Sequence, residues 1–356
     1  MRTDLETGPE AELLERFRAG RRVALARAIS MVEDGRPGFE TILHALHPQV
    51  GRAQRIGLTG PPGAGKSTLT ARLAQAYRDR DERVGIVAVD PTSPFTGGAL
   101  LGDRIRMNGI STDPGVFIRS MATRGALGGL ATTSKEVADV IDAYGFERII
   151  METVGVGQSE LEIAGTADTS VVVLVPESGD SIQAMKAGLM EIADVFVINK
   201  ADRPGADRLA QEIEVMLHMR LGEAAPAAAG HHGVNLKGLG KAARQRTRAA
   251  AQEQGGWSIP VVKTVAQNGE GLDELLRTLD RHHGYLQDTG ELSIRRRRRL
   301  AERVRAVVER RLQRMAWAQG RGAEILEESL PGVERGDESP YAVAERIVRE
   351  VAGRAD

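Results

Sequence analysis

The stretch Arg55-Ile-Gly-Leu-Thr59 followed by Gly60-Pro-Pro-Gly-Ala-Gly-Lys66-Ser67 decides the fold of this chain. Its first part is a short apolar run typical of a buried strand, and residues 66–80 after it have a helical pattern. The loop between them fits the consensus G-x-x-x-x-G-K-S/T, whose glycines let backbone N–H groups surround a phosphate chain without Cβ clashes. The following helix directs its positive N-terminus at the same phosphates. The order of strand, loop and helix therefore predicts a nucleotide-phosphate site.

The positions of this loop have distinct expected roles. Lys66 is expected to reach the β- and γ-phosphates and to supply catalytic charge, and Ser67 is expected to bind Mg²⁺. The expected nucleotide contacts in this segment are Gly60, Pro62, Gly63, Ala64, Gly65, Lys66, Ser67 and Thr68.

The rest of the pattern predicts an α/β fold with a mostly parallel sheet. Further β-rich runs cover 84–89, 148–152, 170–175, 195–198 and 260–263, and helix-like stretches such as 134–144 separate them. Strands that alternate with helices are typical of a parallel sheet covered on both faces, where ligands bind at the carboxyl ends of the strands. The motifs that carry candidate ligands all fall at such ends.

Three parts are predicted along the chain. Residues 1–50 form a helical N-terminal extension, and residues 51–288 form the nucleotide-binding domain. Within that domain, 222–256 is rich in Ala, Gly, Arg and Gln and is predicted to be a flexible insertion. Residues 289–356 form a C-terminal helical region, with a long basic amphipathic helix over 291–320 and a shorter helix over 340–351.

Asn199-Lys200-Ala201-Asp202 follows the predicted strand 195–198 and indicates a guanine base. A carboxylate at Asp202 can accept hydrogen bonds from N1–H and from the 2-amino group of guanine, a donor pair that adenine lacks. Asn199 and Lys200 are expected to brace the phosphate loop and the base plane. The N–H of Ala266, after the last predicted strand, is a second candidate base contact. The nucleotide is therefore expected to be GTP or GDP.

Three acidic residues are candidate magnesium ligands together with Ser67. Glu152-Thr-Val-Gly155 stands where nucleotide-hydrolysing proteins of this kind usually have Asp-x-x-Gly, so Glu152 is expected to act on Mg²⁺ or its waters and the Gly155 N–H to sense the γ-phosphate. Asp90 ends the second predicted strand, and Asp103 lies in a glycine-rich loop. Mg²⁺ takes only one or two carboxylates beside phosphates and waters, so three acids predict a site that rearranges between states.

Composition excludes several classes of function. The 356 residues contain no cysteine, which excludes disulfides, thiolate metal sites and cysteine nucleophiles. The formal net charge is -1, which gives no overall attraction to nucleic acid. The run Arg295–Arg299 is followed by Glu302 and Glu309 and lacks aromatic residues, so it is predicted to be a charged helix face and not a nucleic-acid site.

No membrane association is expected either. The N-terminus has no apolar signal-peptide core, and no apolar run approaches the roughly 20 residues of a membrane span, so we expect a cytoplasmic protein. The pairs His231-His232 and His282-His283 lack regular metal-ligand spacing.

Taken together, these motifs resemble the MeaB/ArgK GTPases. Residues 89–94, 97–107 and 117–121 resemble their first switch, 152–160 the second switch and 179–188 the third. The resemblance carries nucleotide and Mg²⁺ roles onto Lys66, Ser67, Asp90, Asp103, Glu152, Asn199 and Asp202. It implies a GTP-hydrolysing chaperone that gates adenosylcobalamin loading and protects or reactivates a B12-dependent acyl-CoA mutase, chiefly methylmalonyl-CoA mutase. It also implies a homodimer that pairs through the C-terminal helices.

Hydrolysis itself is expected to be slow without a partner. Gln158 in the second switch is a candidate to orient the attacking water, although it fits a surface glutamine equally well. Lys186 or an arginine of the first switch, Arg104 or Arg106, is expected to complete the site when a partner binds. Two alternative functions remain at this point: a kinase of lysine, arginine and ornithine transport, and a metal-insertion GTPase.

Overall fold

The computed structural model of the chain describes residues 8–90, 109–122, 129–153, 165–178, 189–220 and 256–353. It divides into two compact units, residues 1–293 and residues 294–356. The predicted boundaries after residues 50 and 288 stay predictions, and nearly all of the predicted insertion 222–256 lies outside the described residues.

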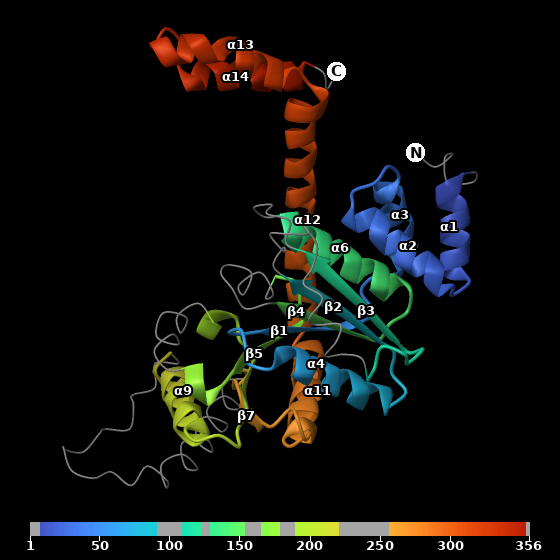
Figure 1. Ribbon diagram of the computed structural model, residues 1–356, viewed down its shortest axis with the longest axis vertical. Coiled ribbons are helices and arrows are strands. Elements are labelled where there is room, and N and C mark those ends of the chain that lie inside the picture. Colours follow the sequence, from blue (N-terminus) through green and yellow to red (C-terminus); the bar gives the residue numbers. More distant parts are fainter. Residues whose placement is uncertain are drawn as a thin grey trace, which may run out of the picture. The chain divides into compact units, whose positions relative to one another are not determined.

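The first unit is built on a seven-stranded sheet in the order β3-β2-β4-β1-β5-β6-β7 (Figure 1). Every neighbouring pair of strands is parallel, which confirms the predicted parallel α/β fold. The strands are β1 (Gln54–Thr59), β2 (Val84–Asp90), β3 (Val116–Ala122), β4 (Arg148–Thr153), β5 (Thr169–Leu174), β6 (Val195–Asn199) and β7 (Val261–Thr264). Six of them match the predicted β-rich runs to within a residue or two, and β3 was not predicted as a strand.

Strand β3, at one edge of the sheet, escaped prediction because polar residues interrupt its apolar run. An edge strand pairs on one side only, so polar side chains can interrupt its apolar pattern. In β3 these are Arg119 and Ser120, and the Arg119 guanidinium binds the carboxylate of Glu33 in the N-terminal helices. Arg119, the charged residue that interrupts the apolar pattern, is therefore used in a tertiary contact.

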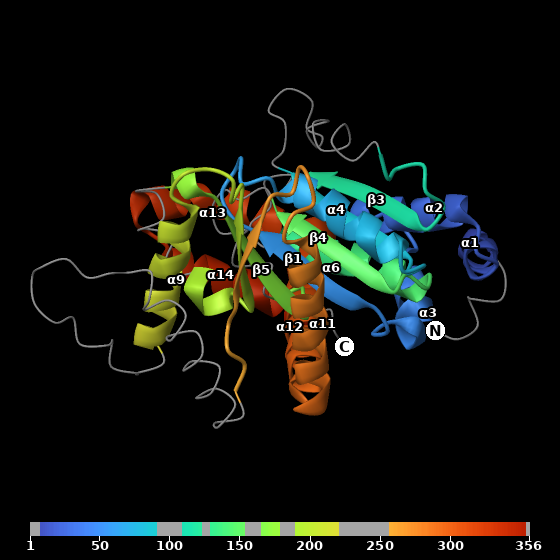
Figure 2. The same cartoon turned by 90° about the horizontal axis from the view of Figure 1, so that it is seen from below.

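Helices cover both faces of the sheet. The helices α4 (Lys66–Arg78) and α11 (Leu272–Asp288) share one hydrophobic cluster with alternate residues of the strands. The intervening residues of the strands face α6 (Gly129–Ala143) and α9 (Ala206–Arg220). Figure 1 shows α6 and α4 on opposite sides of the strands, and Figure 2 shows the same elements from below. Strand residues that are apolar on both faces account for the near-continuous hydrophobic runs in the sequence.

The predicted N-terminal helices form a further layer over α6. They are α1 (Pro9–Arg18), α2 (Arg22–Glu33) and α3 (Phe39–Leu46), followed by the short 3-10 turn η2 (His47–Gln49). Their buried residues join the same hydrophobic cluster as α6, β2 and β4. Arg22 of α2 also donates a hydrogen bond of 2.7 Å to the carbonyl of Pro114, just before β3. The extension is thereby packed into the core of the first unit.

The described elements of the second unit are all helices. The unit contains most of α12 (Glu291–Arg314), the π-helical turn η4 (Met315–Gln319), α13 (Gly322–Arg335) and α14 (Pro340–Ala352). The predicted long helix is confirmed up to residue 314, and α14 matches the predicted 340–351. Helix α13 was not predicted because it contains Pro331 and Gly332, which ordinarily disfavour a helix interior. None of the described helices combines the length and the apolar character that a membrane span requires.

Candidate nucleotide site

The predicted motifs meet at one edge of the sheet. Strands β4, β1, β5, β6 and β7 are consecutive neighbours and parallel, so their carboxyl ends lie side by side. Glu152 is near the end of β4, the glycine-rich loop follows β1, and Asn199 ends β6. Asp90 ends the adjacent strand β2, but its side chain lies outside the description. Asp103, Gly155, Gln158 and Lys186 also fall outside the described residues, so their roles stay predictions.

Two glycines of the loop permit close approaches that a side chain would block. Gly60 has φ 134°, and a Cβ there would lie 2.0 Å from the carbonyl oxygen of Val173 in β5. Gly65 has φ 84°, and a Cβ there would lie 2.4 Å from the Asn199 amide nitrogen. The loop therefore turns back between β1 and α4 while it touches both β5 and the end of β6.

Lys66 begins α4 and is buried beneath the loop. Its ammonium donates hydrogen bonds to the carbonyl oxygens of Gly60 at 2.7 Å and Pro61 at 3.0 Å. The tip of the loop, at Pro62 and Gly63, is exposed. A cation held against the loop at a helix N-terminus, under an open tip, is an arrangement that fits a phosphate chain.

Ser67 and Glu152 are joined directly, although 85 residues separate them in the chain. The Ser67 hydroxyl donates to Glu152 Oε1 at 2.6 Å, and both residues are buried. The hydroxyl of Thr70, one turn further along α4, donates to Glu152 Oε2 at 2.9 Å. A hydroxyl and a carboxylate oxygen are ligands that suit a hard cation such as Mg²⁺, which fits the expected metal position.

Asn199 links the end of β6 to the phosphate loop. Its amide nitrogen donates to the Ala64 carbonyl at 2.8 Å, the loop contact that the sequence predicted. Its amide oxygen accepts from the Ala266 N–H at 3.0 Å and from the Thr264 hydroxyl at 3.2 Å. The Ala266 N–H, a predicted base contact, thus donates to Asn199 in this structure. Contact of that N–H with a base stays a prediction.

The other three residues of the guanine motif, Lys200, Ala201 and Asp202, lie in the turn after β6. Lys200 has the left-handed φ of 56°, and Asp202 is exposed. The N–H of Ala201 donates to the Thr264 carbonyl at 3.0 Å, which ties this turn to the end of β7. The guanine motif therefore lies at the carboxyl ends of β6 and β7, where Asp202 is accessible to solvent, and beside the segment that contains Ala266.

Two residues near the site were missed by sequence reasoning. Thr70 contacts Glu152, and Arg72 donates to the Ala266 carbonyl at 3.1 Å through Nε. Thr70 is three residues from Ser67, so helical spacing alone places both on one face of α4. For Arg72 no local signal exists, because its acceptor is 194 residues away in sequence.

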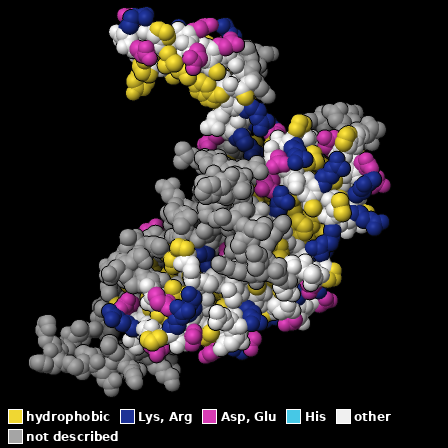
Figure 3. All heavy atoms as spheres, viewed as in Figure 1, with side chains coloured by type: hydrophobic (Ala, Val, Ile, Leu, Met, Phe, Trp, Pro, Cys, Tyr) yellow, Lys and Arg dark blue, Asp and Glu magenta, His cyan; other side chains and the backbone are white. Residues whose placement is uncertain are grey.

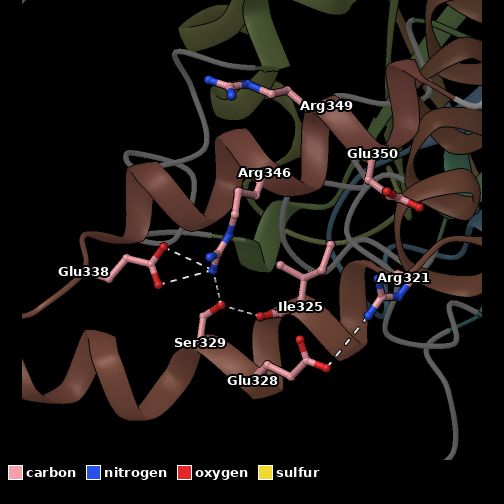
Figure 4. Close-up of a pocket in the computed structure, with 8 residues that line it drawn as sticks. All are labelled: Arg321, Ile325, Glu328, Ser329, Glu338, Arg346, Arg349 and Glu350. Carbon is pink, nitrogen blue, oxygen red and sulfur yellow. Dashed lines mark hydrogen bonds and ion pairs between the residues drawn. The ribbon is translucent and has the colours of Figure 1, made fainter.

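Another polar cluster that the structure describes is a weaker candidate for a ligand site than this edge of the sheet. A hollow of about 600 Å³ between α13 and α14 is lined by three arginines, three glutamates, Ile325 and Ser329 (Figure 4). Its charges are paired within the hairpin, since Arg346 binds Glu338 at 3.1 Å and Arg321 lies 3.9 Å from Glu328. In the part of the chain that the structure describes, no three His, Asp or Glu side chains are grouped to hold a metal ion.

His282 belongs to the core and not to a ligand site. It is fully buried, and its Nδ1 lies 2.8 Å from the Thr169 hydroxyl at the start of β5. Its Nε2 lies 3.4 Å from the Asp194 carboxylate, and its ring packs on Trp257 with centroids 4.6 Å apart. These contacts are at the amino ends of β5 and β6, at the opposite edge of the sheet from the glycine-rich loop.

A parallel sheet with a glycine-rich loop between β1 and α4 and a buried Lys-Ser pair at the start of α4 defines the P-loop class of nucleotide-binding proteins. The sequence model of the family described as "Methylmalonyl Co-A mutase-associated GTPase MeaB" matches residues 25–321 of this chain. The chain belongs to the MeaB family and is a GTPase.

Relatives extend this likeness over nearly the whole chain. A protein of Pyrococcus abyssi that is named as a GTPase is 44% identical over 96% of this chain and 97% of its own length. The mouse protein "Methylmalonic aciduria type A homolog, mitochondrial" is 33% identical over 78% of this chain and 64% of its own. The crystal structure of a LAO/AO transport system kinase has a TM-score of 0.63 and 24% identity, with 96% of each chain covered, and supports the fold alone.

Proposed function

We propose that this GTPase is a chaperone of an adenosylcobalamin-dependent acyl-CoA mutase, most simply methylmalonyl-CoA mutase, and that GTP binding and hydrolysis gate cofactor loading and protect or reactivate the mutase. The observation that carries the proposal is the match of the MeaB family model, whose description names this mutase, across residues 25–321. The paired Ser67 and Glu152, and the Asn199 bridge to the phosphate loop, are consistent with a nucleotide switch at its centre.

The proposed nucleotide is GTP or GDP with Mg²⁺. Lys66 and the backbone of the loop would hold the phosphates, and Ser67 and Glu152 would hold the metal. Asp202 would accept hydrogen bonds from the guanine, with Asn199 and Lys200 bracing the loop and the base. Mg²⁺ would neutralise charge on the phosphates during transfer, while Lys66 adds a fixed positive charge beside them.

The chain is further proposed to work as a homodimer. Helix α12 has no buried residue along its 24 residues within the single chain. Its apolar residues Leu300, Val304, Val308 and Leu312 recur every four positions and are each about half exposed or more. Figure 3 shows hydrophobic side chains also gathered along one side of the α13–α14 hairpin. An apolar stripe of this length on a helix favours a second copy of the chain as its cover.

The test is a GTP-dependent complex with the mutase. The full chain is loaded with a non-hydrolysable GTP analogue, with GDP or with no nucleotide, and is then used to capture proteins from the source cell and to bind the purified mutase. We expect mutase capture that depends on the nucleotide state, and GTP hydrolysis that rises when the mutase is added. Lys66→Ala should abolish both effects.

The matched control is Arg208→Ala, which removes an exposed arginine that pairs with Glu212 one turn away. It should behave like the wild type. A mutase that binds equally in all nucleotide states, or hydrolysis that the mutase never changes, would contradict the proposal. Phosphate transfer to a captured transport protein would support the kinase alternative in its place.

A further inference from the structure

The carboxylate of Glu152 is held from one helix at both of its oxygens. Ser67 donates to Oε1 at 2.6 Å and Thr70 donates to Oε2 at 2.9 Å. Thr70 is fully buried, and Glu152 is 4% exposed. Hydrogen bonds to an ionised carboxylate are stronger than neutral ones, and away from water the loss of one is not compensated by solvent.

The position of Thr70 makes this contact unusual for a threonine inside a helix. Such hydroxyls often bond back to the carbonyl four residues earlier in their own helix. Here the Thr70 hydroxyl donates across to β4, 82 residues away, and reaches the acid of the second switch motif. Glutamate has one more rotatable bond than the aspartate more usual at this position, so its carboxylate needs a second anchor to keep one orientation.

We propose that Thr70 is a positioning residue of the metal site: it fixes the Glu152 carboxylate so that Oε1 stays beside the Ser67 hydroxyl, and it thereby sets the affinity of the nucleotide-bound protein for Mg²⁺. This inference rests on the proposed Mg²⁺–GTP site. Thr70 itself touches neither nucleotide nor metal in this assignment. It acts through Glu152 alone, so an experiment can distinguish its effect on Mg²⁺ binding from a role in phosphate binding.

The test compares two substitutions at this position in the full chain. Thr70→Val keeps the shape and removes the hydroxyl, whereas Thr70→Ser keeps the hydroxyl. The measurement is the release rate of a fluorescent GDP as Mg²⁺ is titrated, together with the rate in excess EDTA. Mg²⁺ is expected to slow GDP release, and Thr70→Val should raise the Mg²⁺ concentration that gives half of this slowing by about tenfold. A change of that size is expected from the loss of one charge-assisted hydrogen bond. Thr70→Ser should stay within about twofold of the wild type.

The release rate in EDTA should be the same for all three proteins, because the phosphate loop is unchanged. A double-mutant cycle with Glu152→Gln supplies the second readout. If Thr70 acts through Glu152, adding Thr70→Val to Glu152→Gln should change the Mg²⁺ dependence no further. Thr278→Val, at another buried threonine in α11, is the matched control and should leave the titration unchanged.

Several outcomes overturn the inference. A Thr70→Val protein with the Mg²⁺ dependence of the wild type would show that the hydroxyl does not position the acid. Faster release in EDTA, or effects that simply add in the double mutant, would assign Thr70 to the loop or to general stability. If GDP release from the wild-type protein does not depend on Mg²⁺, both the proposed metal site and this inference are refuted. The other outcomes refute the inference alone.

Discussion

At the scale of single residues, two glycines of the phosphate loop lie so close to neighbouring strands that no larger side chain would fit in their place. Gly65 lies against the Asn199 amide, and that amide in turn holds the Ala64 carbonyl. Lys66 is held by the Gly60 and Pro61 carbonyls. The phosphate loop is therefore shaped by its contacts with neighbouring strands as well as by its own glycines.

Gly65→Ala should cost more stability than an equivalent change at Gly63. Both glycines have left-handed φ values, 84° and 76°, so alanine brings a strain of about 1–2 kcal/mol at either position. At Gly65 the new Cβ would also collide with Asn199, whereas at Gly63 it would meet no atom within 4 Å. Urea unfolding without nucleotide should show a clearly larger loss of unfolding free energy for Gly65→Ala. Equal losses would contradict the Asn199 contact.

Asp202→Asn should change which base is bound. Its carboxylate is expected to accept from N1–H and the 2-amino group of guanine, and an amide would instead offer a donor to the 2-oxo group of xanthine. We expect GTP affinity to fall by at least about tenfold and the preference for GTP over xanthosine triphosphate to shrink, measured by competition with a fluorescent GDP. Asp207→Asn, at an exposed aspartate that pairs with Lys263, is the control. An unchanged preference would mean that Asp202 does not read the base.

At the scale of elements, the helix that begins at the phosphate loop is fixed to α11 at its other end. Near the end of α4, Arg80 binds Asp280 of α11 at 2.8 Å. Arg148 at the start of β4 lies over the ring of Tyr77, 4.8 Å from its centroid, and 3.8 Å from Asp280. The ring of Tyr77 is thus enclosed between α4, β4 and α11. These contacts connect α4, the helix that begins at the phosphate loop, to α11 beside it.

Tyr77→Phe should leave the protein as stable as the wild type or slightly more stable. Among the described residues the buried Tyr77 hydroxyl has no hydrogen-bond partner, and burial raises the pKa of this phenol above its ordinary value of 10.0. Removing an unsatisfied polar group should add up to about 1 kcal/mol to the unfolding free energy at pH 8. Tyr341→Phe, at an 87% exposed tyrosine, should change nothing. A loss of several kcal/mol would show that the hydroxyl has a partner.

The raised pKa of the Tyr77 phenol also predicts how the stability of the protein changes with pH. A raised pKa means that the folded protein keeps the proton when the unfolded chain begins to lose it. The wild type should therefore lose stability as pH rises above about 10, and Tyr77→Phe should lose less over that range. Urea unfolding of both proteins at pH 8 and at pH 10.5 measures the difference. Parallel losses would contradict burial of the phenol.

At the scale of the whole molecule, two units with different surfaces make up the chain. The first unit has an extensive core on both faces of its sheet. The second unit is helical, and in α12 every residue is at least partly exposed. A helix with an exposed apolar stripe is consistent with assembly in solution.

Replacing Val304 and Val308 together by glutamate should dissociate the proposed homodimer. Two charges would enter the middle of the apolar stripe on α12, where burial of an unpaired charge is costly. Sedimentation should show a dimer for the wild type and a monomer for this variant, while GDP affinity at the phosphate loop stays within about twofold. Glu309→Gln on the same helix should remain a dimer. A wild-type monomer at micromolar concentration would contradict the dimer.

Much of the fold was predictable because it follows from local patterns. Buried strands of a parallel sheet are apolar on both faces and therefore stand out as short runs, and six of the seven were found in this way. Strand β3 and helix α13 were not, since Arg119 and Pro331 contradict the local pattern while tertiary packing overrides it. The loop residues from Gly60 to Ser67 were assigned from eight consecutive positions between a predicted strand and helix.

The sequence by itself determined the class of fold, the phosphate loop and the family, because each depends on residues that are neighbours along the chain or recur with a fixed period. Only the tertiary structure decided which atoms of distant residues meet there. The Asn199 amide on Ala64 spans 135 residues, and the Thr70 hydroxyl on Glu152 spans 82. Such pairs are set by the order and register of the strands, and a hydrogen bond made by a side chain to a distant residue leaves no periodic trace in either partner's own segment.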